Sequence, residues 1–188
     1  MNEIKTSISH PLIVNHIDLS SHTEYKGLIG MSFCPGKHHR SEFGNYEWHR
    51  DLVADMAVIK SWGADIWLNL MEDQDLKAVG FEPDVFCQAI KNEGFEYLHF
   101  PIVDGFIPDQ VSDLIWRNEL SPYLFESLKE GKKVFIHCRG GLGRTGLIAA
   151  KLLVYFGVSP QDAINITRKV RRGAIENSVQ EQWVTRLG

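Results

Sequence analysis

The chain has 188 residues, of which 44% are hydrophobic and 23% are charged, and we expect residues 1–188 to form one domain with a sizeable core. The formal net charge of −4 argues against a protein that binds nucleic acid through a general positive field. The sequence has no apolar run near the roughly 20 residues that span a bilayer, and its first residues lack a secretory-signal pattern, so we predict a cytoplasmic protein with no membrane partner.

Short β-rich runs alternate with helical patterns along the first two thirds of the chain. In chain order we predict a strand at 26–31, a helix at 47–62, a strand at 64–70, a helix at 83–92, a strand at 95–100, a helix at 110–130 and a strand at 133–137. The first helix is indicated by apolar residues at helical spacing: Trp48, Leu52, Met56 and Ile59. Pro122 should interrupt or kink the third helix.

The last third of the chain changes character, because no strand pattern follows 133–137. The segment 147–156 is apolar on nearly all sides, which indicates a buried central helix. Gly157 stands where a helix would end, and Ser159 and Pro160 are typical of the start of the next helix. This order predicts an α/β fold with a mostly parallel central sheet flanked by helices, and a helical C-terminal third.

A glycine-rich loop follows the strand at 133–137 and opens a helix. Glycines at 140, 141 and 143 allow successive backbone N–H groups to surround one anion, and the helix directs its positive end at the same place. Cys138 stands at the base of this loop, where these groups favour its thiolate form. Arg144 closes the loop, and its planar guanidinium suits two oxygens of a phosphoryl group.

Two other interpretations of this loop exist. Gly141-x-Gly143-x-x-Gly146 also matches the dinucleotide-binding fingerprint, but the βαβ unit that this fingerprint needs is missing, since the residues after Gly146 have helical patterns. Cys138 alone would ordinarily be a small buried apolar residue. The glycines and Arg144 around it favour a phosphate-binding loop instead.

The motif His137-Cys138-x-x-Gly141-x-x-Arg144-Thr145-Gly146 resembles the active-site loop of cysteine-dependent protein phosphatases. The segments 100–109 and 173–180, and more weakly 30–36, resemble the kinase-associated phosphatase family of the dual-specificity group. This resemblance implies a protein-tyrosine-phosphatase-like fold that hydrolyses phosphate monoesters on phosphorylated proteins, at tyrosine and/or serine and threonine. The reaction would pass through a phosphocysteine and need no cofactor and no metal.

The resemblance also assigns roles to residues outside the loop. Asp104 would protonate the leaving oxygen and then act as base for water; Asp109 is the rival acid, although its position favours a helix N-cap. Gln180 would orient the water, Thr145 would donate to the sulfur, and a buried His137 would support the loop through hydrogen bonds. The residues expected to bind substrate phosphate are Arg139, Gly140, Gly141, Leu142, Gly143 and Arg144.

Several questions stay open at this point. The basic run at 168–172 is either a solvated face or a docking patch, and Cys34 and Cys87 are either inert thiols or partners of Cys138 under oxidation. His38, His39 and His49 have no spacing typical of a metal site. Alternative functions are a phosphatase for a phosphoinositide or an RNA 5′-triphosphate, and a phosphate-binding adaptor without turnover. The oligomeric state is not indicated.

Overall fold

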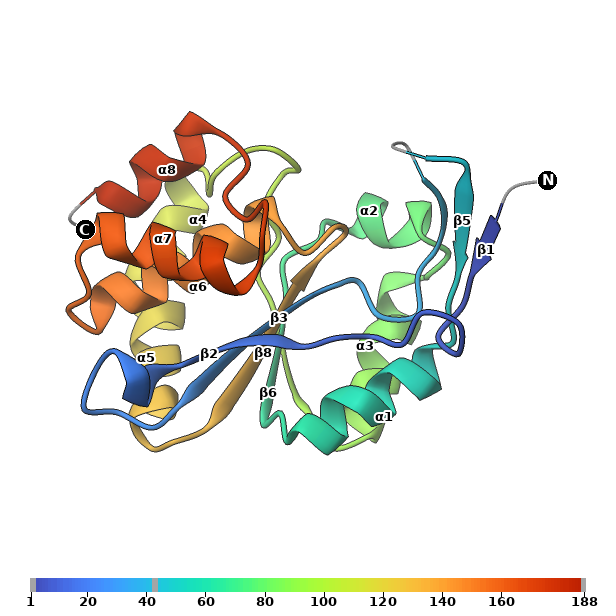
Figure 1. Ribbon diagram of the computed structural model, residues 1–188, viewed down its shortest axis with the longest axis horizontal. Coiled ribbons are helices and arrows are strands. Elements are labelled where there is room, and N and C mark those ends of the chain that lie inside the picture. The colour runs from blue at the N-terminus through green and yellow to red at the C-terminus, as the bar shows by residue number, and fades with distance from the viewer. Residues whose placement is uncertain (1–2, 42–43, 187–188) are drawn as a thin grey trace.

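A five-stranded sheet forms the centre of the computed structural model, which describes residues 3–41 and 44–186 (Figure 1). The strand order is β2-β3-β8-β6-β7; β3, β8, β6 and β7 run parallel, and β2 pairs antiparallel with β3 at one edge. The mostly parallel sheet is therefore confirmed, as are all four predicted strands. The strands are β2 (Asn15–Asp18), β3 (Leu28–Phe33), β6 (Ile66–Asn69), β7 (Glu96–His99) and β8 (Lys133–Cys138).

The register of the parallel strands brings the ends of β3, β6 and β8 to one edge of the sheet. Phe33 pairs with Cys138, and Asn69 pairs with His137. Strand β8 lies between β3 and β6, and every residue of it after Lys133 is buried. Cys138 is thus held at the carboxyl edge of the sheet, where α/β proteins place their ligand sites.

Helices cover both faces of the sheet. Figure 1 shows α5, α6 and α7 on one side, and α1 and α3 on the other. Every residue of α6 from Gly143 to Leu153 is buried, which confirms the predicted central helix. The helices are α1 (Leu52–Trp62), α2 (Asp73–Ala78), α3 (Pro83–Asn92), α4 (Gln110–Ile115), α5 (Ser121–Lys129), α6 (Gly143–Tyr155), α7 (Pro160–Val170) and α8 (Ser178–Thr185), with a 3-10 turn η1 (Leu19–Ser21) and a π-helical turn η2 (Trp116–Leu120).

The helix boundaries around α5, α6 and α7 follow the predicted signals. The π-helical turn η2 lies directly before α5, whose second residue is Pro122. Proline lacks an N–H group and crowds the carbonyl four residues earlier, and a wider turn relieves both effects. After α6, Gly157 adopts a left-handed φ of 85°, and the Ser159 side chain accepts the Asp162 N–H at 3.2 Å to begin α7.

A second, three-stranded sheet was not predicted. It consists of β1 (Glu3–Lys5), β5 (Tyr46–His49) and β4 (His38–Arg40), in the order β1-β5-β4. The predicted helix at 47–62 is therefore wrong at its start, because Trp48 lies in β5 and pairs with Lys5 and His39. Helix α1 begins at Leu52, where the Asp51 carboxylate accepts the Ala54 N–H at 2.9 Å as an N-cap.

Candidate active site

The loop from Cys138 to Arg144 joins the end of β8 to the start of α6. The Cys138 Sγ accepts a hydrogen bond from the Gly141 N–H at 3.2 Å, and Cys138 is only 3% exposed. Gly141 has a φ of 68°, and a Cβ at this position would lie 2.2 Å from the Ser32 carbonyl oxygen. Glycine is therefore required here. The loop directs a backbone donor and the positive end of α6 at one anionic site.

Arg144 is buried at the start of α6 and contacts two other segments, α2 and the segment after β7. Its Nη1 donates to Asp75 Oδ2 at 2.5 Å and to the Ile102 carbonyl at 3.0 Å, and its Nη2 lies 3.0 Å from Asp104 Oδ1. Burial opposes the charge, but Cys138, Asp75 and Asp104 outweigh it and raise the pKa of Arg144. One nitrogen thus fixes the guanidinium, while Nε has no hydrogen bond within the described residues.

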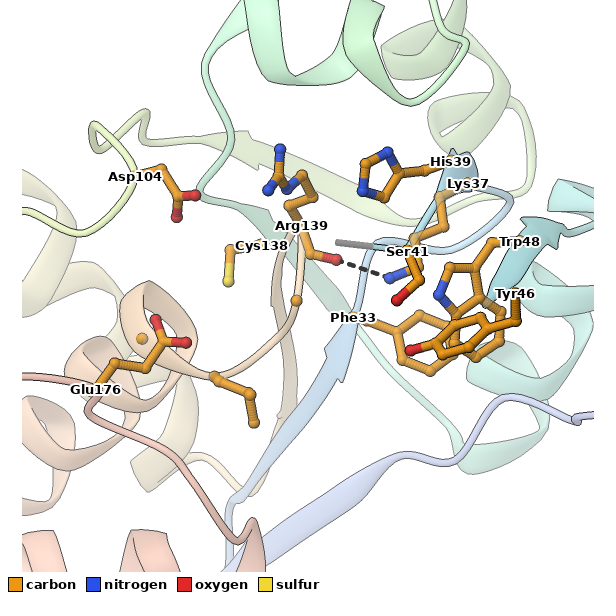
Figure 2. Close-up of a pocket in the computed structure, with 13 residues that line it drawn as sticks. Phe33, Lys37, His39, Ser41, Tyr46, Trp48, Asp104, Cys138, Arg139 and Glu176 are labelled. Carbon is orange, nitrogen blue, oxygen red and sulfur yellow. Dashed lines mark hydrogen bonds between the residues drawn. The ribbon is translucent and has the colours of Figure 1, made fainter. Parts of the chain in front are cut away.

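Asp104 and Asp109 have different surroundings. Asp104 lies in an exposed turn closed by the Phe106 N–H donating to the Val103 carbonyl at 3.1 Å, and its carboxylate faces the cavity over Cys138 (Figure 2). Asp109 accepts the Ser112 N–H at 2.8 Å at the start of α4, and this bond lowers the pKa of Asp109. The predicted N-cap at Asp109 is confirmed, and of these two aspartates Asp104 is the one that lines the cavity.

Gln180 and Asn177 lie together at the start of α8. The buried Gln180 accepts the Glu176 N–H through Oε1 at 2.8 Å, and its Nε2 lies 3.0 Å from the position of a Cβ on Gly143, facing the loop. Asn177 caps α8 by accepting the Gln180 N–H at 3.0 Å, and it donates to the Gly105 carbonyl at 2.9 Å. Asn177 therefore ties the turn that carries Asp104 to the segment that carries Gln180.

His137 and Thr145 are both fully buried beside the loop. Neither ring nitrogen of His137 makes a hydrogen bond in the described part of the chain, so the predicted hydrogen bonds to the loop are absent there. His137 instead packs against the rings of Trp67 and Phe135, and burial lowers the pKa of His137 to about 3. The Thr145 Oγ1 has no hydrogen-bond partner among residues 3–41 and 44–186, so its hydroxyl is free to make the predicted hydrogen bond to the sulfur.

A cavity of about 310 Å³ opens over Cys138. Figure 2 shows Asp104 and Glu176 on one side of the sulfur, and Arg139, Lys37 and aromatic rings on the other. Burial and the nearby Asp104 raise the pKa of Glu176, although the Gly143 N–H and Arg144 oppose this shift. The predicted phosphate-binding residues that line the cavity are Arg139, Gly140, Leu142 and Gly143.

The basic run at 168–172 contains cations with internal roles. Arg171 donates to the Gly140 carbonyl at 3.1 Å, to the Gly141 carbonyl, and to Asn15 Oδ1 at 2.7 Å. Arg168 donates to the carbonyls of the segment before α8 and to Glu181. The run is therefore not a uniform solvated or docking face, since Arg171 supports the phosphate loop.

Of the residues that the sequence left open, His39 lines this cavity, and the Cys34 N–H donates to the Arg139 carbonyl of the loop at 3.3 Å. Burial raises the pKa of the Cys34 thiol to about 12, which makes it a poor nucleophile, and Cys87 is half-buried in α3. Within 3–41 and 44–186, no group of three or more His, Cys, Asp or Glu side chains is arranged to hold a metal ion. No helix in the described ranges is long and apolar enough to cross a bilayer.

Four residues around the loop were missed by sequence reasoning. Asp75 lies in α2, a short helix without a repeated apolar face, and Lys37 follows β3 in a turn. Glu176 belongs to the segment that resembles the phosphatases, which was the available signal. Arg171 was noticed only as one member of a basic run, and nothing in the spacing distinguished it from Arg172.

The family model for cyclin-dependent kinase inhibitor 3 (CDKN3) matches residues 10–164. The chain belongs to this family. The match includes Asp104 and the whole loop from Cys138 to Arg144, and it ends before Gln180. Among CDKN3 relatives, the rat cyclin-dependent kinase inhibitor 3 is 36% identical over 140 residues, which cover 64% of this chain and 64% of the rat protein. The human protein is 34% identical over the same shares.

Solved structures confirm the protein-tyrosine-phosphatase-like fold of this CDKN3 member. The kinase associated phosphatase, with its catalytic-site cysteine substituted by serine, has a TM-score of 0.77 and 28% identity; the match covers 93% of this chain and 92% of the other. Tk-PTP in its active form has a TM-score of 0.60 and 29% identity, with 83% and 88% covered. The family resemblance drawn from the sequence is thereby confirmed.

Proposed function

We propose that this chain is a cysteine-dependent protein phosphatase that hydrolyses phosphate monoesters on tyrosine and/or serine and threonine. The observation that carries the proposal is the convergence of Asp104, from the segment after β7, with Cys138 and Arg144 of the phosphate loop on one site. Membership of the CDKN3 family supports it. Further support comes from the similar kinase associated phosphatase, which has a catalytic-site cysteine.

In the first step the Cys138 thiolate attacks phosphorus in line, forming a sulfur–phosphorus bond as the bond to the ester oxygen breaks. The Asp104 carboxyl gives its proton to the departing oxygen. The loop amides and Arg144 stabilise the charge on the equatorial oxygens, which is the main catalytic requirement of phosphoryl transfer. The product of this step is a phosphocysteine.

In the second step water attacks the phosphocysteine. The Asp104 carboxylate takes a proton from this water, and the Nε2 and Oε1 of Gln180 orient it. The sulfur–phosphorus bond breaks, the Thr145 hydroxyl donates to the leaving sulfur, and inorganic phosphate departs. Cys138 returns to its thiolate form, so no other reactant is needed.

We also propose that residues 1–188 act as one catalytic domain on phosphorylated proteins in the cytoplasm. All three cysteines are free thiols, which suits a reducing compartment. The dual specificity expected from the resemblance belongs to this proposal, because an acid and a phosphate loop alone do not distinguish tyrosine from serine or threonine esters.

Hydrolysis of para-nitrophenyl phosphate, phosphopeptides, a phosphoinositide and an RNA 5′-triphosphate tests the proposal. We expect turnover of the aryl phosphate and of phosphopeptides, lost by about a thousandfold or more in Cys138→Ser. Faster turnover of the phosphoinositide or the RNA 5′-triphosphate than of the phosphopeptides would show that the substrate is not a phosphorylated protein. Tight phosphopeptide binding without any turnover would make the chain an adaptor.

A further inference from the structure

The cavity over Cys138 extends beyond the phosphate loop to the small sheet. Its far wall consists of Phe33, at the end of β3, and of Tyr46 and Trp48 from β5 (Figure 2). The Trp48 ring lies 5.3 Å from that of Phe33 and 5.5 Å from that of Tyr46, between ring centroids. The aromatic wall, meaning these three rings, therefore stands beside the site that receives phosphate.

Lys37 places a buried ammonium group between this wall and the loop. Its Nζ lies 4.6 Å from the centroid of the Phe33 ring and 5.0 Å from that of Trp48, and it donates to the Arg139 carbonyl at 3.2 Å. The same carbonyl accepts the Cys34 N–H at 3.3 Å, so the turn that carries Lys37 is fixed to the loop. Lys37 is 6% exposed, and it lines the cavity.

A second cation at the same rings provides a direct contrast. The Arg50 guanidinium lies 4.8 Å from the Phe33 ring centroid, and both its Nε and Nη2 donate to the Asp55 carboxylate at 2.8 Å. Lys37 has no such carboxylate within salt-bridge distance in the part of the chain that the structure describes. Burying an ammonium without a paired carboxylate is costly, and burial lowers the pKa of Lys37 to about 8, although Cys34 and Cys138 oppose this shift. Lys37 is therefore a buried positive charge at the cavity, and unlike Arg50 it is not paired with Asp55.

We propose that Lys37 and the aromatic wall form a subsite for the carboxylate side chain of a glutamate or aspartate next to the phosphorylated residue of a peptide substrate. The subsite rests on the proposed function, and it adds a sequence preference to it. A carboxylate carries the single negative charge that one ammonium matches, and the rings of Tyr46 and Trp48 offer apolar surface to its methylene groups. Because Asp104 and Glu176 line the opposite side of the cavity, an acidic neighbour is favoured only on the Lys37 side.

Paired phosphopeptides that differ only in Glu or Gln beside the phosphoresidue test this subsite. With the acidic residue scanned over the flanking positions, we expect at least one position where the wild-type kcat/KM for Glu exceeds that for Gln about tenfold, a typical value for a charge-assisted hydrogen bond. The ratio should fall to near one in Lys37→Met. The control Lys169→Met, which removes an exposed lysine on α7, should keep the wild-type ratio. Taking a ratio removes any effect of Lys37 on Cys138 that is common to all peptides.

A ratio near one at every position in the wild type, or an unchanged ratio in Lys37→Met, would overturn the subsite while leaving the proposed function intact. A preference for a flanking phosphoserine that glutamate does not share would overturn it too. Failure to hydrolyse any phosphopeptide would instead contradict the proposed function. If no phosphopeptide is hydrolysed, or if Lys37→Met does not fold, the subsite is tested by binding the Glu and Gln peptides to Cys138→Ser. The Glu peptide, unlike the Gln peptide, should then raise the pKa of Lys37, measured by NMR of its Nζ; equal pKa values in the two complexes would refute the contact.

Discussion

Replacing Arg171 by alanine separates the roles of two adjacent arginines. Arg171 donates to the carbonyls of Gly140 and Gly141 and to Asn15, while Arg172 is exposed. Arg171→Ala removes two hydrogen bonds to the loop and one to Asn15 in β2, together with one positive charge. Arg172→Ala removes the same charge from the neighbouring position, so the pair distinguishes support of the loop from a general effect of charge.

The expected magnitude follows from these contacts. A hydrogen bond from a charged donor contributes about 1.5–3 kcal/mol when it is buried. Arg171 is only partly buried and water can replace it at the carbonyls, so we expect a total loss of about 2 kcal/mol in the free energy of unfolding. Because a displacement of about 1 Å in a catalytic site can cost on the order of a hundredfold in rate, kcat/KM for an aryl phosphate should fall by about that factor.

Urea denaturation and steady-state kinetics measure both effects. Arg172→Ala should stay within about 0.5 kcal/mol and about twofold of the wild type, as surface substitutions usually do. Arg171→Lys should be intermediate, because lysine keeps the charge but cannot donate in a fork. If Arg171→Ala and Arg172→Ala behave alike, the reasoning that Arg171 supports the phosphate loop is refuted.

Three further predictions concern the acid, the buried histidine and a helix glycine. Asp104→Asn should lower kcat by about a hundredfold or more and flatten its pH dependence, whereas Asp109→Ala should lower stability with little effect on rate; equal kinetic losses would contradict the assignment. The pKa of His137 is about 3 in the folded chain and 6.5 in a free histidine, so between these pH values only the unfolded chain protonates the imidazole. The free energy of unfolding should therefore fall as the pH drops below about 6.5, by about 2 kcal/mol at pH 5. Denaturation at pH 7 and pH 5 should show a smaller drop in His137→Asn. Gly146→Ala should cost about 1–3 kcal/mol, because its Cβ would lie 2.7 Å from the Ala174 Cβ, while Gly140→Ala, with no atom within 4 Å, should be near neutral in unfolding.

Local signals in the sequence account for most of what could be predicted. The buried run of β8 and the glycines at 140, 141 and 143 act within a short segment, so the strand, the loop and the start of α6 were all predictable. The caps at Asp109 and Ser159 are likewise local. These elements already fixed Cys138 and Arg144 as one site.

Contacts between distant segments were not predictable in the same way. Asp75 contacts Arg144 although they are 69 residues apart in the sequence, and Asn15 contacts Arg171 although they are 156 apart. The arrangement of the whole sheet brings these pairs together. Trp48 fitted a helical spacing, yet its pairing with β1 and β4 overrides that pattern, as tertiary contacts often do. The aromatic wall and Lys37 therefore became recognisable only once the small sheet was placed beside the loop.

The central claim is that phosphate passes through a covalent bond to Cys138. Rapid acid quenching during turnover of a labelled phosphate ester, followed by mass spectrometry of the digested protein, tests it most directly. The mechanism predicts a phosphoryl group on Cys138 that is absent in Cys138→Ser. Turnover without any phosphorylated enzyme, a phosphoryl group on another residue, or full activity in Cys138→Ser would contradict it.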